Sequence, residues 1–549
     1  MTAIDAITLE IMRNQFESVA DEMGQVLVTS SYSPNIKERR DCSTALFDAE
    51  GRLVAQAEHI PVHLGAMPEA VATVLEYDPE PGDVFVLNDP FEGGTHLPDV
   101  TMVSPLVVDG DVLGYAVSRA HHADVGGMTP GSMPAGAREI YQEGLRIPPV
   151  RLVSGGDVND DVMALFLANV RNPGERRADV RAQIAANERA ADRLAELVDE
   201  HGRAQVVDAF DAVIAYSRDR VTAELRDLPD GTYHATDVLE GDGVSDDDIP
   251  IEVTVTIAGG SIRVDFEGTA PQVAGNVNAP LAVAKSAVYF VVRCVTDPEI
   301  PPNQGCYDPI DVVVPDGSLL DPNPPAAVVG GNVETSQRVT DVVFSALAEA
   351  APERVPAQGQ GTMNNLTIGS RTGDDGFTYY ETIGGGFGGR AGGDGMDGVQ
   401  VGMTNTLNTP IESLEAEYPM VVERYSLREN SGGRGEFRGG LGIVRSLTVQ
   451  TDATVSLLTE RRRVAPKGIA GGEDGLVGKN VIETPDSDDS EQGDSDVAGG
   501  GGIVPAKVTR DVPAGTTVTV YTPGGGGYGD PSDRTPEAIE RDVADEKMD

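Results

Sequence analysis

Residues 88–127 read NDPFEGGTHLPDVTMVSPLVVDGDVLGYAVSRAHHADVGG, and this stretch decides how the N-terminal part of the chain folds. Two apolar runs, residues 100–108 and 112–119, flank the pair Asp109-Gly110, which is favoured in tight hairpins. A shorter apolar run over residues 83–87 precedes them and stops at Asn88-Asp89-Pro90. The pattern predicts an antiparallel hairpin beside a further buried strand.

The predicted hairpin would gather the residue types that a metal site needs. It returns the end of its second strand to the start of its first, so His121 and His122 approach His96 and Asp99. Two histidines and one carboxylate leave positions open for water and substrate, and they suit Zn, Mn or Fe rather than Ca or Mg. We predict His96, Asp99 and His121 as metal ligands. The short H-x-x-D pattern also fits histidines that only bridge loops by hydrogen bonds.

Neighbouring residues are candidates for proton transfer. Side chains alternate along a strand, so His122 would face away from His121. His122 and Asp124 are predicted either to contact and orient the metal ligands or to move protons. Glu143 is our preferred general base over Glu139, although most glutamates are simply solvated.

Other polar residues are candidates for substrate binding. Arg39 and Arg40 lie in a charged loop and could together grip a phosphate or carboxylate, while a surface salt bridge explains them equally well. His59 and His63 fit hydrogen-bonded core or loop residues better than ligands, but they could line the same cavity. The predicted substrate-binding residues are Arg39, Arg40, Asp41, Asn88 and Asp89.

The rest of the chain predicts an α+β protein of several domains, with a β-rich core and a long helical segment. Helical spacing covers residues 6–31 and 160–226, the latter broken at Asn172-Pro173-Gly174 and at Gly202. A strand pair around Gly259-Gly260 follows. The expected regions are an N-terminal α+β region with the metal site (1–155), a helical segment (156–228), a central α+β domain (229–420) and a β-rich C-terminal region (421–549) with a disordered acidic insert (483–502).

Glycine clusters at residues 384–389 and 524–527 lack the strand, helix and acidic context of a dinucleotide site. Tight turns or close backbone packing explain them better.

Composition excludes several classes of function. The formal net charge of −48 leaves no basic face for nucleic acid, and halophilic proteins use such charge to stay soluble in salt. We therefore expect a halophilic source, with an ordinary acidic protein as the alternative. No apolar run approaches the roughly 20 residues of a membrane span, and charges near the start argue against a signal peptide. Three scattered cysteines fit a reducing compartment, so we expect a cytoplasmic protein without membrane contact.

Long strings of the sequence carry a resemblance that covers nearly the whole chain. In chain order they include SPNIKERRDCSTALFD (33–48), LVAQAEHIPVHLGAMPE (53–69), NDPFEGGTHLPDV (88–100), RAHHADVGGMTPGSMP (119–134), GNVETSQRVTD (331–341), SGGRGEFRGGLG (431–442) and TPGGGGYGDP (522–531). They resemble the hydantoinase B family, which includes the B components of N-methylhydantoinase and 5-oxoprolinase. That family is similar to the large subunit of acetone and acetophenone carboxylases.

The resemblance implies a division of labour between subunits. In such systems a hydantoinase A-type partner with an actin-like ATPase fold phosphorylates an oxygen of the substrate, and the B-type component completes the reaction. His96, Asp99 and His121 match positions that hold a divalent metal in the related carboxylase subunits. The chain lacks a G-x-x-x-x-G-K-[ST] phosphate loop, which agrees with ATP being used by the partner.

The function implied is that of a metal-dependent component in a hetero-oligomer that opens a small cyclic amide, such as a hydantoin or 5-oxoproline, at the expense of ATP. One alternative is a component of an ATP-dependent carboxylase, in which the metal presents an enolate to carbon dioxide. Another is a non-enzymatic acidic scaffold whose histidines only bridge loops.

Overall fold

The computed structural model, which describes residues 4–370, 376–485 and 502–548, is built around a seven-stranded sheet in the N-terminal part of the chain. The strand order is β2-β1-β5-β4-β3-β6-β7, and all neighbours are antiparallel. The strands are β1 (Cys42–Asp48), β2 (Leu53–Glu58), β3 (Val84–Leu87), β4 (Asp99–Val108), β5 (Asp111–His121), β6 (Val150–Ser154) and β7 (Asp157–Val158). The predicted hairpin is confirmed as β4 and β5, and Asp109 and Gly110 both adopt the positive φ that such a tight turn requires.

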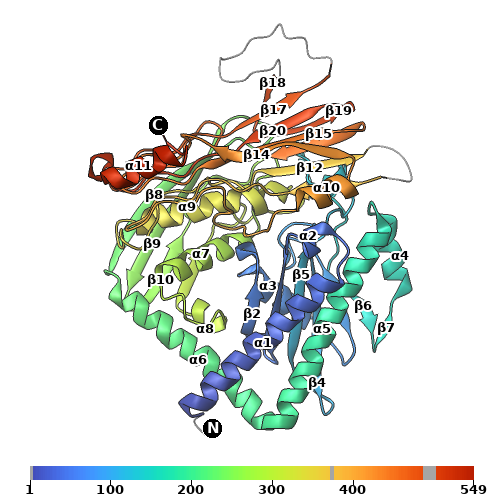
Figure 1. The fold of residues 1–549 in the computed structure, drawn as a ribbon. Coiled ribbons are helices and arrows are strands. Elements are labelled where there is room, and N and C mark those ends of the chain that lie inside the picture. Colours follow the sequence, from blue (N-terminus) through green and yellow to red (C-terminus); the bar gives the residue numbers. More distant parts are fainter. Residues whose placement is uncertain (1–3, 371–375, 486–501, 549) are drawn as a thin grey trace.

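Helices cover both faces of this sheet (Figure 1). On one face α1 (Ala6–Ser30) and α5 (Pro173–His201) lie side by side and bury Phe16 and Ala186 against the sheet. On the other face α3 (Ala66–Leu75) packs in a second core.

The predicted helical segment consists of α4 (Asp160–Ala168), α5 and α6 (Arg203–Asp227). The break at Gly202 lies where it was expected, whereas the first break covers residues 169–172, because Pro173 begins α5 instead of interrupting a helix. The segment packs on the first sheet, where the Gln183 side chain on α5 donates to the carbonyl oxygens of Val100 and Ser118. The division of the chain into four regions stays a prediction.

A second sheet and the three helices α7, α8 and α9 form the middle of the molecule. The sheet has the order β11-β10-β9-β8 and includes the predicted hairpin. Helix α9 packs on β8 and β9, and one π-helical turn, Gly331–Thr335, precedes it. The elements are β8 (Gly231–Glu240), β9 (Asp248–Ala258), β10 (Ser261–Asp265), α7 (Leu281–Val295), α8 (Gln304–Tyr307), β11 (Ile310–Val313) and α9 (Ser336–Leu347).

Two further sheets share one apolar core in the C-terminal part. Their orders are β13-β12-β16-β19 and β14-β15-β20-β17-β18. The elements are β12 (Asn365–Ser370), β13 (Thr378–Glu381), α10 (Ile411–Glu417), β14 (Met420–Arg428), β15 (Gly442–Val449), β16 (Ala453–Leu458), β17 (Lys479–Glu483), β18 (Gly502–Val504), β19 (Lys507–Val512), β20 (Thr517–Tyr521) and α11 (Pro536–Ala544). Most of the predicted acidic insert, residues 486–501, lies outside the described residues. The expected α+β class with a β-rich core is confirmed.

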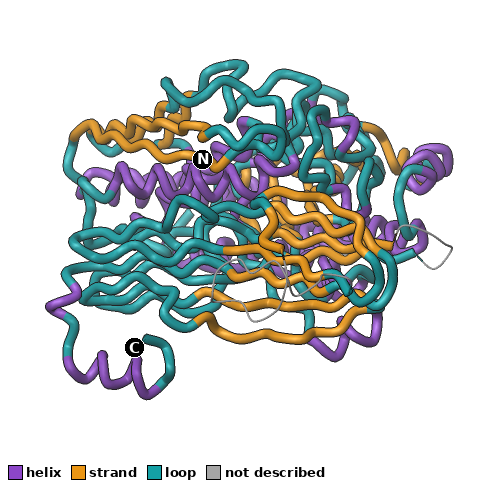
Figure 2. The backbone as a smooth tube through the Cα atoms, turned by 90° about the horizontal axis from the view of Figure 1, so that it is seen from above, coloured by secondary structure: helices purple, strands orange, loops and turns teal. Residues whose placement is uncertain are grey.

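Glycine-rich loops extend beside these sheets, and Figure 2 shows loop segments running alongside one another there. The Gly525 backbone N–H donates to the Gly440 carbonyl oxygen at 2.9 Å, and the Gly389 N–H donates to that of Gly526 at 2.8 Å. A Cβ atom at Gly525 would lie 2.1 Å from the Phe387 carbonyl oxygen. Close backbone packing therefore accounts for the glycine clusters, as the sequence predicts.

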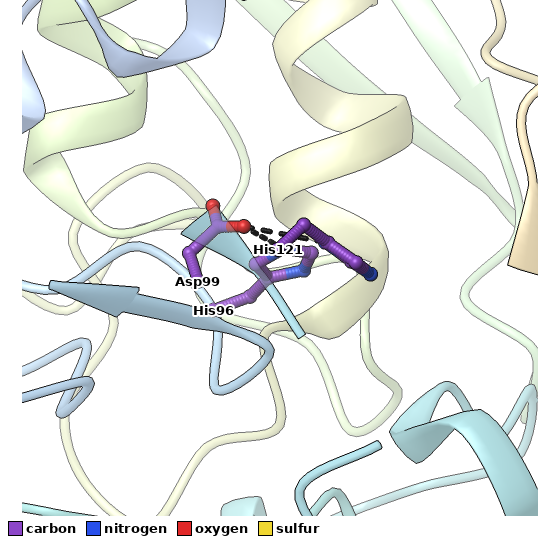
Figure 3. Close-up of side chains that lie close together, drawn as sticks. All are labelled: His96, Asp99 and His121. Atoms are coloured by element: carbon purple, nitrogen blue, oxygen red, sulfur yellow. Dashed lines mark hydrogen bonds and ion pairs between the residues drawn. The ribbon is translucent and has the colours of Figure 1, made fainter. Parts of the chain in front are cut away.

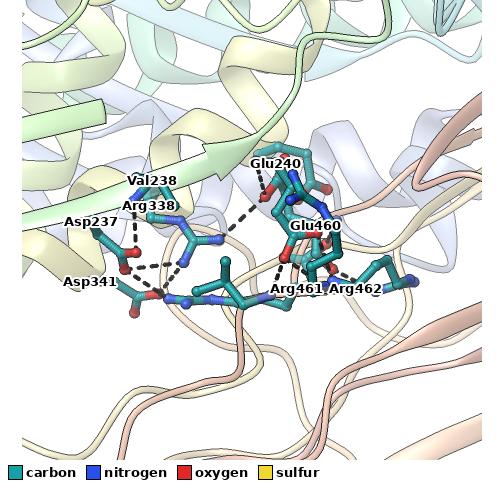
Figure 4. Close-up of polar contacts among 12 residues, drawn as sticks. Asp237, Val238, Glu240, Arg338, Asp341, Glu460, Arg461 and Arg462 are labelled. Atoms are coloured by element: carbon teal, nitrogen blue, oxygen red, sulfur yellow. Dashed lines mark hydrogen bonds and ion pairs between the residues drawn. The ribbon is translucent and has the colours of Figure 1, made fainter. Parts of the chain in front are cut away.

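A network of buried charges fixes α9 against β8 and the segment after β16 (Figure 4). Arg338 on α9 donates to Asp237 at 3.2 Å and to Glu460 at 3.4 Å, and Arg461 donates to Asp341 at 2.6 Å. Charges this deeply buried are tolerated only when they are paired. The network therefore holds in place α9, and the π-helical turn that precedes α9 contacts Asp99 through Asn332. In the described parts of the chain, every helix is too short or too polar to cross a membrane.

Candidate metal centre

The three predicted ligands lie together at the open end of the β4–β5 hairpin (Figure 3). Asp99 begins β4, His121 ends β5, and the two residues are direct partners in the strand register. The loop before β4 supplies His96, whose carbonyl oxygen accepts a hydrogen bond from the Asp99 N–H. Asp99 Oδ1 lies 3.0 Å from His96 Nε2 and 3.3 Å from His121 Nδ1. One possible ligand atom from each residue lies within 4.8 Å of the other two.

Burial sets the protonation of this cluster. Each of the three residues is at most 2% exposed. Burial alone would raise the pKa of Asp99, but the charge of His96 and hydrogen bonds from His121 and His63 outweigh it and hold that pKa well below its usual range. Burial lowers the pKa of His121 to about 4. At neutral pH the carboxylate is therefore ionised and His121 is neutral, which are the states that bind metals.

Two ring nitrogens support the fit of a metal to these residues. His96 Nδ1 and His121 Nε2 are buried and have no hydrogen-bond partner among the described residues. Buried polar atoms are rarely left unsatisfied, because each such atom costs free energy. The donor set of two imidazoles and one carboxylate fits Zn, Mn or Fe.

Further residues surround Asp99. Thr95 Oγ1 donates to Asp99 Oδ2 at 2.8 Å, and Asn332 Nδ2 donates to the same oxygen at 3.4 Å. His63 Nε2 lies 3.6 Å from this oxygen, and its Nδ1 lies 2.9 Å from Ser43 Oγ. Sequence reasoning favoured a core or loop role for His63, although the closeness of residues 59–63 to the other histidines was a signal for the same cavity.

Tyr380 also belongs to the site, and nothing in the local sequence identified it. Its ring stacks on the His121 ring with centroids 4.6 Å apart and an interplanar angle of 16°. Tyr380 lies on β13, which belongs to a different sheet from β5. Burial raises the pKa of its hydroxyl well above the ordinary value, so the group remains a donor.

The structure gives the residues predicted for proton transfer other partners. His122 Nε2 lies 3.0 Å from Gln183 Oε1, on the opposite face from His121, as strand alternation predicts. Asp124 pairs with Arg171 at 3.0 Å and accepts the N–H groups of Gly126 and Gly131.

Glu143 is fully buried and accepts the N–H groups of Val328 and Val329. Burial raises its pKa to about 8, against the effect of these hydrogen bonds. The roles of His122, Asp124 and Glu143 in proton transfer stay predictions.

Arg39 and Arg40 do not form the expected joint grip. Arg39 is buried and donates to Thr382 Oγ1 at 2.7 Å and to Thr406 Oγ1 at 3.0 Å. Arg40 is exposed and has a left-handed backbone with φ of 56°. The left-handed turn explains why adjacent arginines reach different environments. Arg39 remains beside the site, because its guanidinium lies 6.0 Å from the centre of the Tyr380 ring.

The other predicted substrate-binding residues also lie in different environments: Asp41 contacts His121, whereas Asn88 and Asp89 bond to other parts of the chain. The Asp41 carbonyl oxygen accepts the His121 N–H at 3.0 Å, and burial together with Asp99 raises the pKa of the Asp41 carboxyl to about 7. Asn88 bonds to the backbone of Leu97 and Ile147 and so fixes the loop that carries His96. Asp89 pairs with Arg146 at 3.0 Å.

Known proteins are similar to this chain over almost its whole length. The family described as hydantoinase B/oxoprolinase matches residues 5–531. An uncharacterized protein of Methanocaldococcus jannaschii is 41% identical over 99% of this chain and 94% of its own length. A Pseudomonas protein named as the B component of a D-/L-hydantoinase is 33% identical over 99% of this chain and 93% of its own length. The 5-oxoprolinase 1 of Arabidopsis thaliana is 40% identical over 96% of this chain, which spans only 42% of that longer protein.

Solved structures share the fold. The ATP-dependent caprolactamase from Pseudomonas jessenii has a TM-score of 0.90 and 31% identity, covering 100% of this chain and 95% of that chain. Acetone carboxylase in a nucleotide-free state has a TM-score of 0.89 at 20% identity, covering 99% of this chain and 78% of that chain, and this likeness concerns the fold alone. The predicted resemblance is confirmed: the chain belongs to the hydantoinase B/oxoprolinase family.

Proposed function

We propose that the chain is the metal-dependent B component of an ATP-dependent enzyme that opens a small cyclic amide. The observation that carries the proposal is the buried His96, Asp99 and His121 cluster, in a chain that matches the hydantoinase B/oxoprolinase family over residues 5–531. The names of its relatives point to one substrate class, because 5-oxoproline, hydantoins and caprolactam all contain a cyclic amide.

The residues of the chain would act as follows. His96, Asp99 and His121 would hold a divalent Zn, Mn or Fe ion, and such an ion supplies Lewis acidity and lowers the pKa of water towards neutrality. The described residues bury this cluster almost completely, which excludes bulk water and strengthens electrostatic interactions there. Arg39 and Asp41, beside Tyr380 and His121, would orient the substrate, and His122 or Glu143 would move protons.

The proposal includes an ATPase partner. Amide resonance makes an unstrained cyclic amide resistant to hydrolysis, and phosphorylation of its carbonyl oxygen by the partner would activate that carbon. Two observations support a separate partner: the sequence lacks a phosphate loop, and the Pseudomonas relative is named as one component of a hydantoinase. The chain also spans only two fifths of the Arabidopsis 5-oxoprolinase, and the remainder of that protein would correspond to the partner. We place the resulting hetero-oligomer in the cytoplasm.

The test is turnover by the assembled enzyme. The chain is produced with a hydantoinase A-type ATPase partner and incubated in high salt with ATP and 5-oxoproline, hydantoin or caprolactam. We expect a ring-opened product in proportion to the ADP formed, and its loss in a complex that carries His96→Ala. Bicarbonate-dependent consumption of acetone, without amide hydrolysis, would instead assign the chain to the carboxylases.

A further inference from the structure

Tyr380 reaches the candidate metal centre from a distant part of the chain. His121 ends β5 in the N-terminal sheet, whereas Tyr380 lies on β13 in a C-terminal sheet. The two rings are nearly parallel, at 16°, with centroids 4.6 Å apart. Both residues are 2% exposed, so the contact is enclosed by protein.

A single hydrogen-bonding contact from the described residues orients the His121 ring. A ligating histidine normally donates its second ring N–H to a carboxylate, a carbonyl oxygen or water, and this hydrogen bond fixes the ring plane. In His121, Nδ1 faces Asp99 Oδ1 at 3.3 Å, while Nε2 has no hydrogen-bond partner in the described parts of the chain. The Nδ1 contact is long and comes from a side chain that is itself a predicted ligand. The Tyr380 ring, which covers one face of the imidazole, supplies a second contact that restricts the ring plane.

A chain of hydrogen bonds anchors Tyr380 in turn. Its hydroxyl donates to Asn365 Oδ1 at 2.9 Å, and Asn365 Nδ2 donates to Glu334 Oε1 at 2.8 Å. Glu334 is fully buried in the π-helical turn before α9. The same turn contributes Asn332, which donates to Asp99. One buried turn thus supports two of the three ligands, one directly and one through Asn365 and Tyr380.

We propose that Tyr380 is a positioning residue for the metal ligand His121, with its ring held in place by Asn365 and Glu334. The inference rests on the proposed metal centre and deepens it. The ligands come from residues 96–121, and part of their support, Asn332 and Tyr380, comes from far along the chain. That part of the support forms only when the segments carrying Asn332 and Tyr380 pack against the N-terminal sheet.

The adjacent residue provides a matched control. Tyr379 lies on the same strand, is also 2% exposed, and donates its hydroxyl to Glu381 Oε2 at 2.9 Å. Its ring packs on Tyr418 instead of His121. Leu and Phe substitutions at each tyrosine separate loss of the ring from loss of the hydroxyl. The readouts are the affinity of the full chain for Co²⁺, measured by competition with a chelator, and the visible absorption spectrum of bound Co²⁺.

We expect Tyr380→Leu to weaken Co²⁺ binding about 10- to 100-fold, the usual effect of removing a group that supports a metal ligand. Tyr380→Phe should weaken it about 3- to 10-fold, the value of one hydrogen bond. Both should alter the absorption spectrum, whereas the Tyr379 variants should keep the wild-type affinity and spectrum.

Wild-type affinity and spectrum in the Tyr380 variants would overturn the inference, as would equal losses in the Tyr379 variants. If the Leu variants do not fold, the two Phe variants decide the matter by the same criteria. Absence of Co²⁺ binding by the wild-type chain would overturn the proposed metal centre as well, so the two failures are distinguishable.

Discussion

His121 and His122 are neighbours in the sequence but meet different surroundings. His121 joins Asp99 and His96 on one face of the hairpin, and His122 contacts Gln183 on the other. Strand alternation predicted this separation from the sequence. It could not predict which partners each residue meets, because Gln183 and Tyr380 lie on elements far away in the chain. The local pattern therefore predicted that His96, Asp99 and His121 lie together, whereas the residues around this cluster depend on tertiary packing.

Glu143 leads to a prediction about pH at the residue scale. Burial raises its pKa from 4.5 to about 8, so the folded protein keeps this carboxyl protonated where the unfolded chain ionises. The contribution of Glu143 to the free energy of unfolding is therefore complete below about pH 4.5 and is lost as the pH rises towards 8. We expect Glu143→Gln, which can still accept the N–H groups of Val328 and Val329, to gain on the order of 4 kcal/mol over the wild type by pH 8.

Urea unfolding of both proteins between pH 5 and 8, at constant salt, measures this difference. A stability difference that does not change with pH would contradict the raised pKa of Glu143.

At the scale of elements, local signals were sufficient for the regular parts of the fold. The Asp109-Gly110 turn and the break at residue 202 were predicted where the structure has them, and the break before α5 was predicted within a few residues of its position at 169–172. The π-helical turn at Gly331–Thr335 was not, because its shape depends on contacts with other segments. His63 is a buried, hydrogen-bonded histidine beside the same cavity, as predicted, but its closeness to Asp99 could not be read from the sequence, because that distance depends on tertiary packing.

The packing of the glycine-rich loops gives a second prediction. A Cβ atom at Gly525 would lie 2.1 Å from the Phe387 carbonyl oxygen, so Gly525→Ala must displace backbone. We expect the free energy of unfolding to fall by about 3 kcal/mol or more. Thermal and urea unfolding in high salt provide the measurement.

Gly174→Ala is the matched control for this substitution. Gly174 lies in the first turn of α5, and a Cβ atom there would have open space around it. This change should leave stability unchanged or raise it by up to about 1 kcal/mol. Equal effects of the two substitutions would show that close backbone packing does not require glycine at residue 525.

For the whole molecule, the dominant property is its charge of −48. Such a surface repels itself in dilute salt, because the Debye length grows from about 3 Å at 1 M to about 30 Å at 0.01 M. We expect the unfolding temperature to rise with KCl and the native structure to be lost below roughly molar salt. Circular dichroism across a KCl series measures this, with sucrose as an uncharged control. Full stability in dilute buffer would contradict the halophilic interpretation.

The metal content of the purified chain tests the central claim most directly. Elemental analysis is performed on the wild type, on His96→Ala and on His122→Ala, all purified in high salt. We predict close to one transition-metal ion per chain in the wild type and in His122→Ala, and loss of that metal in His96→Ala, because His96 contacts Asp99 whereas His122 contacts Gln183. Absence of metal from all three proteins, or its retention in His96→Ala, would contradict the account.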